Sequence, residues 1–101
     1  MTYANPTERQ EFTSGLRELA DFLENNPEVP APKYTDVLVF PPHASDAENR
    51  SEIDVIASRI GSGAEISPGH RHYVTSRKFG PVEYRAVAIP SNDAGNDRDG
   101  E

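Results

Sequence analysis

The chain has 101 residues, of which 35% are hydrophobic and 27% charged, and it contains neither cysteine nor tryptophan. This length fits one small domain and leaves no room for a second core. The absence of cysteine excludes disulfides, thiolate metal sites and cysteine nucleophiles. The longest apolar run, Val37 to Phe40, is far shorter than the ~20 residues that a membrane span needs, and the N-terminus lacks the basic and apolar regions of a signal peptide. We therefore expect a soluble, cytoplasmic protein with no membrane partner.

The net charge of −7 is distributed unevenly along the chain. Residues 1–69 carry twelve acidic and five basic side chains, and residues 91–101 carry four acidic and one basic. Residues 70–90 reverse this balance, with four basic side chains and one acidic. The overall charge opposes non-specific adhesion to nucleic acid, whereas the basic segment keeps a site-specific contact open.

The first predicted element is a helix from Thr7 to about Asn25, after a flexible N-terminus of residues 1–6. Thr7 with Gln10 resembles a capping box, and Pro27 ends the helix because it disfavours helical geometry at the residue before it. The apolar positions recur at intervals of three or four residues and form one stripe of an amphipathic helix. They are Phe12, Leu16, Leu19, Ala20 and Leu23.

A strand from Tyr34 to Phe40 and a second helix follow. Val37 to Phe40 shows no polar alternation, which predicts a strand covered on both faces. Ser45 and Glu48 have the spacing of a capping box, and Gly61 is a typical helix end. The buried stripe of this helix is predicted to comprise Ile53, Ile56, Ala57 and Ile60.

Beyond Gly63 the apolar period changes from that of a helix to that of strands. A short strand is expected at 64–67, and residues 72–78 and 82–89 are expected to form a hairpin around Phe79, Gly80 and Pro81. In the last strand Tyr84, Ala86 and Ala88 should face one way. Residues 91–101 hold no large apolar side chain and are predicted to form a disordered acidic tail, which leaves 7–90 as the single folded domain.

The order helix, strand, helix, strand, strand, strand predicts an α+β fold with two helices packed on a small, mainly antiparallel sheet. If the first strand pairs in parallel with a later strand across the second helix, the crossover should be right-handed. Such a small core predicts marginal stability or a homodimer that adds burial. The last strand supports the homodimer, because Val87 and Ile89 on one face and Ala86 and Ala88 on the other leave both faces partly apolar.

The residues that could carry catalysis do not combine into a site. His70 and His72 would share one face of a strand, yet a catalytic metal site needs three protein ligands, and no carboxylate is obviously matched to them. No serine lies in a nucleophile elbow, and the glycines at 61 and 63 follow a helix end, whereas a phosphate-binding loop precedes a helix start. We expect no enzyme, no catalytic residues, no metal and no other cofactor.

The hairpin offers a more plausible contact surface. Arg71, Tyr73, Thr75 and Arg77 should share one face of its first strand, where basic and aromatic side chains could hold phosphates and stack bases. Alternatively, the tyrosines cover the sheet and the arginines balance the acidic helices, or the acidic surfaces themselves imitate a phosphate backbone. The candidate binding residues are Arg71, Tyr73, Arg77, Lys78, Tyr84 and Arg85. The favoured interpretation is an interaction module that presents a surface to another protein, and the alternative is a nucleic-acid-binding accessory protein.

Two stretches carry a resemblance to known sequences. They run from Gly15 to Glu24, followed by Pro27, Val29 and Pro30, and from Lys78 to Val87, with the Phe-Gly-Pro-Val-Glu-Tyr-Arg run as the most specific part. Together they are similar to a group of small uncharacterised proteins of actinobacteria and their phages, over about 80 residues. The resemblance implies a bacterial cytoplasmic or phage-encoded setting and assigns no catalytic or binding residue.

Overall fold

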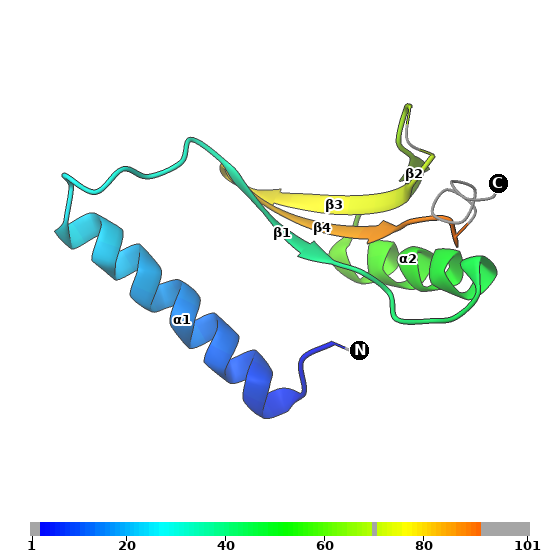
Figure 1. Cartoon of the computed structure of the whole chain (residues 1–101), viewed down its shortest axis with the longest axis horizontal. Helices are drawn as coiled ribbons and strands as arrows, with labels where there is room; N and C mark the ends of the chain where they lie inside the picture. The colour runs from blue at the N-terminus through cyan, green and yellow to red at the C-terminus, as the bar shows by residue number, and fades with distance from the viewer. Residues whose placement is uncertain (1–2, 70, 92–101) are drawn as a thin grey trace, which may run out of the picture. The chain divides into compact units, whose positions relative to one another are not determined.

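The computed structural model of the chain describes residues 3–69 and 71–91. Its elements are α1 (Pro6–Asn25), β1 (Thr35–Val39), α2 (Asp46–Ile60), β2 (Glu65–Ile66), β3 (Tyr73–Phe79) and β4 (Val82–Ala88), as Figure 1 shows. This order confirms the α+β prediction. The chain divides into two compact units, one that ends at Lys33 and one that begins at Tyr34.

The first unit consists of α1 and the segment that follows it. Asn5, not Thr7, caps the helix: its side chain accepts a hydrogen bond from the Glu8 amide (2.8 Å), and the Glu8 carboxylate accepts one from the Asn5 amide (3.0 Å). The prediction placed this cap two residues too late. Asparagine caps helices more strongly than threonine, and Pro6 suits the first helical position because that position needs no amide donor.

No residue of α1 is buried. The predicted packing of a helix on the sheet is confirmed for α2, and none of the buried core residues belongs to α1. We define the apolar face of α1 as Phe12, Leu16, Leu19, Phe22 and Leu23. The first four of these residues are between 43% and 53% exposed.

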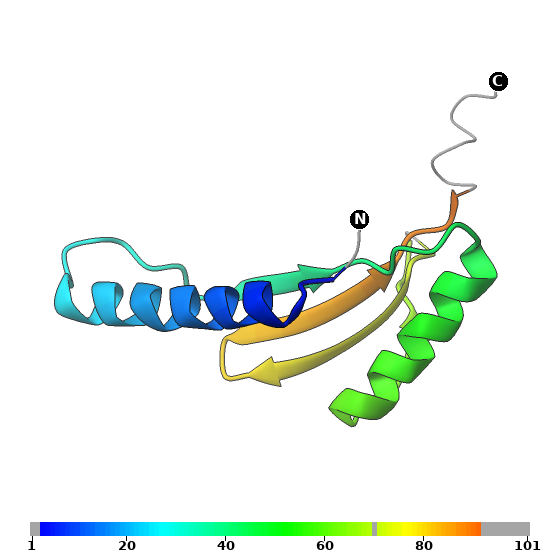
Figure 2. The same ribbon diagram turned by 90° about the horizontal axis from the view of Figure 1, so that it is seen from below.

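The second unit places α2 on a four-stranded sheet of order β1-β4-β3-β2 (Figures 1 and 2). β1 pairs in parallel with β4, whereas β4 with β3 and β3 with β2 are antiparallel. The hairpin turns at Gly80, whose φ of 64° lies in the left-handed region that glycine adopts without strain. The sheet is thus mixed, with the predicted hairpin at its centre.

Helix α2 begins and ends where the sequence indicates. The Ser45 hydroxyl accepts from the Glu48 amide at 3.1 Å and donates to the Glu48 carboxylate at 3.2 Å. Gly61 adopts φ 72° and closes the helix, with its amide directed at the last-turn carbonyls. Of the predicted stripe, Ile53 and Ala57 are buried and the other two positions are half-buried.

The main buried cluster lies between α2 and the two central strands, whereas Val74 and Val87 are buried on the opposite face of the sheet. Ile53 is completely buried against Ala86 and Ala88, and Tyr84 packs beside them. These three residues of β4 share one face, as predicted, and that face lies against α2. On the helix side of β3, the buried Thr75 hydroxyl donates to the Gly63 carbonyl at 3.0 Å. This bond ties the loop after α2 to the sheet.

Strand β1 forms an edge of the sheet, which corrects the prediction that it is covered on both faces. Leu38 is 51% exposed, and Phe40 just beyond the strand is also exposed. An unbroken apolar run is typical of a central parallel strand, but here the run belongs to an edge strand with one covered face. β4 is internal, so its backbone edges are both occupied by strands of the same chain.

The exit from β4 is held to the start of α2. The Ser91 amide donates to the Asp46 carboxylate at 3.0 and 3.2 Å, and its hydroxyl donates at 3.2 Å. Of the acidic tail predicted at 91–101, residues 92–101 lie outside the described part of the chain, as do residues 1–2 of the predicted flexible N-terminus.

Candidate functional site

The six candidate residues of the hairpin do not share one surface. Cross-strand register places Tyr73, Arg77 and Tyr84 on the face that α2 covers, and Lys78 and Arg85 on the opposite face. Arg71 precedes β3 with a φ of 60°, a conformation that few non-glycine residues adopt. Both tyrosines and one arginine therefore share the face toward α2, whereas the other two basic side chains of the strands lie on the opposite face.

Tyr73, the aromatic centre of the predicted surface, is engaged by α2. Its hydroxyl donates to the Asp54 carboxylate at 2.6 Å, and the Arg50 guanidinium lies 5.4 Å from its ring centroid. The hydrogen bond to Asp54 raises the pKa of Tyr73 above its ordinary value, with desolvation and the Asp54 charge adding in the same direction. Tyr73 thus joins β3 to one turn of α2, and its ring is already in contact with a cation.

The neighbouring arginines also have partners within the hairpin. The Arg77 guanidinium lies 5.0 Å from the Phe79 ring centroid, a cation–π contact between residues two apart on one strand. Arg85 approaches Glu83 at 3.8 Å on the opposite face. Both are surface contacts of small energetic value, so the two arginines remain accessible to a ligand.

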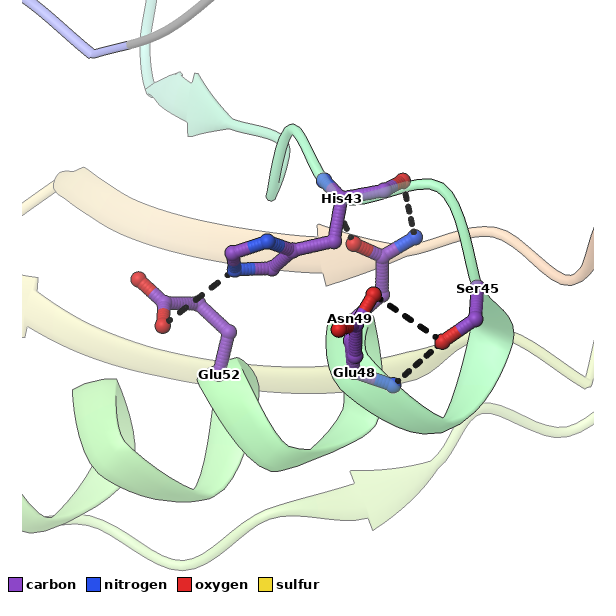
Figure 3. Close-up of polar contacts among 5 residues, drawn as sticks. All are labelled: His43, Ser45, Glu48, Asn49 and Glu52. Carbon is purple, nitrogen blue, oxygen red and sulfur yellow. Dashed lines mark hydrogen bonds and ion pairs between the residues drawn. The ribbon is translucent and has the colours of Figure 1, made fainter.

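Five polar side chains at and just before the start of α2 form a cluster (Figure 3). The Asn49 side chain accepts from the His43 amide at 3.0 Å and donates to the His43 carbonyl at 3.3 Å. The His43 imidazole points along the helix toward Glu52, with 3.7 Å between Nε2 and Oε1. The amide of Asn49 therefore fixes the loop that joins β1 to α2.

This cluster has the residue types of a hydrolase site but not its connections. The nearby hydroxyl, that of Ser45, donates to the Glu48 carboxylate and caps α2. A nucleophile would instead donate to an imidazole that a carboxylate orients. The sequence analysis did not single out Asn49. The only sign of its role in the sequence is its position, an amide side chain in the first turn of a helix that follows Pro41 and Pro42.

The space beside the polar cluster and the spacing of possible metal ligands bear on whether this part of the chain holds a small molecule. The hollow beside Asp46, Asn49, Ile89 and Pro90 has a volume of only about 10 Å³, space for about one water molecule. Among the described residues, no three His, Asp or Glu side chains lie close enough together to hold a metal ion. His70, one half of the predicted histidine pair, lies outside those residues.

The largest concentration of exposed apolar side chains on one element is the apolar face of α1. The sequence predicted its periodicity but could not indicate that it would remain exposed. No helix among the described residues has the length and hydropathy to cross a membrane. Comparisons of the chain with protein-family models, with curated proteins and with solved structures find no match.

Proposed function

We propose that this chain is a non-enzymatic protein-binding module and that the apolar face of α1 is its contact surface. The observation that carries the proposal is that four large side chains of this face are 43–53% exposed on a helix with no buried residue. Most helical stability in proteins comes from packing of an apolar face, and none of the 20 residues of α1 is buried. Burial against a partner would supply that packing.

The spacing and charge of α1 indicate the chemistry of the partner. Phe12, Leu16, Leu19 and Leu23 follow one another at intervals of four, three and four residues, which suits a helix that lies in an apolar groove. The helix carries five acidic and two basic side chains, a net charge of −3. A protein groove with an apolar floor and a basic rim fits both features.

Several observations support a binding role over a catalytic one. The hydroxyl of Ser45, the amide of Asn49 and the phenol of Tyr73 all serve in caps or in links between elements. The bacterial or phage-encoded setting, and location in the cytoplasm, remain predictions from the sequence.

A matched pair of charge variants tests the proposal. Leu19→Glu places a carboxylate on the apolar face, and Ser14→Glu places the same charge about 140° around the helix. We expect a tagged wild-type chain and Ser14→Glu to retain the same protein from a lysate of the source cell, and Leu19→Glu to lose it. In a titration with that protein once purified, Leu19→Glu should bind at least about tenfold more weakly, because a buried leucine contributes about 1.5–3 kcal/mol.

Two results would contradict the proposal. Equal affinity of the two variants for the retained protein would show that the apolar face of α1 is not the contact. Retention of nucleic acid that is released steeply as salt rises, with no protein retained, would favour the basic hairpin in its place.

A further inference from the structure

We draw no further inference here: the strongest candidate, the half-exposed apolar pair Leu38 and Phe40 at the β1 edge of the sheet, carries no proposal because nothing in the structure shows what covers it.

Discussion

Replacement of Ile53 by alanine probes the packing of α2 on the sheet. Ile53 is 0% exposed and contacts Ala86 and Ala88 at the centre of the core. The substitution removes three carbon atoms, worth about 2.4 kcal/mol at ~0.8 kcal/mol each, and leaves a cavity that adds to this loss. We expect a total of about 2–5 kcal/mol, because the small alanines opposite cannot reach into the space.

The assay is urea unfolding followed by far-ultraviolet circular dichroism, with two matched controls. Ile53→Val removes one carbon and should cost about 0.5–1.5 kcal/mol. Val55→Ala, at an exposed position of the same helix, should change stability by about 0.5 kcal/mol or less. If Ile53→Ala were no more destabilised than Val55→Ala, α2 would not be docked through Ile53 and the described core would be wrong.

Three further predictions concern local structure. The folded state raises the pKa of Tyr73, so the hydrogen bond from Tyr73 to Asp54 should stabilise the protein below pH 10. This stabilisation should be lost as the pH rises through the raised pKa. The free energies of unfolding of wild type and Tyr73→Phe, compared from pH 8 to 11, measure the loss. Asn49→Ala should cost about 1 kcal/mol and speed hydrogen exchange at the His43 amide. Gly61→Ala should destabilise the protein by about 1 kcal/mol, because the φ of Gly61 is 72°. Gly15→Ala should instead stabilise α1 by about 0.5–1 kcal/mol, since nothing lies near the added methyl group. Thermal unfolding followed at 222 nm compares the two variants.

Local signals predicted most of the fold. Ser45 and Gly61 mark the ends of α2 because capping depends on the neighbouring residues alone. Gly80 marks the hairpin turn for the same reason. The error at the start of α1 was also local: Asn5 and Thr7 are both capable caps, and the stronger one with proline after it prevails.

What the sequence could not predict depends on contacts between distant residues. An apolar run such as Val37 to Phe40 is compatible with either a central or an edge strand, and only the pairing of β1 with β4 decides between them. The surroundings of the candidate binding residues could not be predicted for a related reason. Residues two apart in a strand share a face, which the sequence predicts. It does not predict that α2 lies against the face that carries Tyr73.

Hydrogen exchange by mass spectrometry, on the full chain alone and with the captured protein partner, tests the proposed contact most directly. We predict weak protection of residues 9–25 in the chain alone and strong protection in the complex, because partner binding buries the apolar face of α1. Exchange in residues 34–69 should change little. Protection that rises only in the hairpin of residues 71–85, with α1 unchanged, would contradict the account.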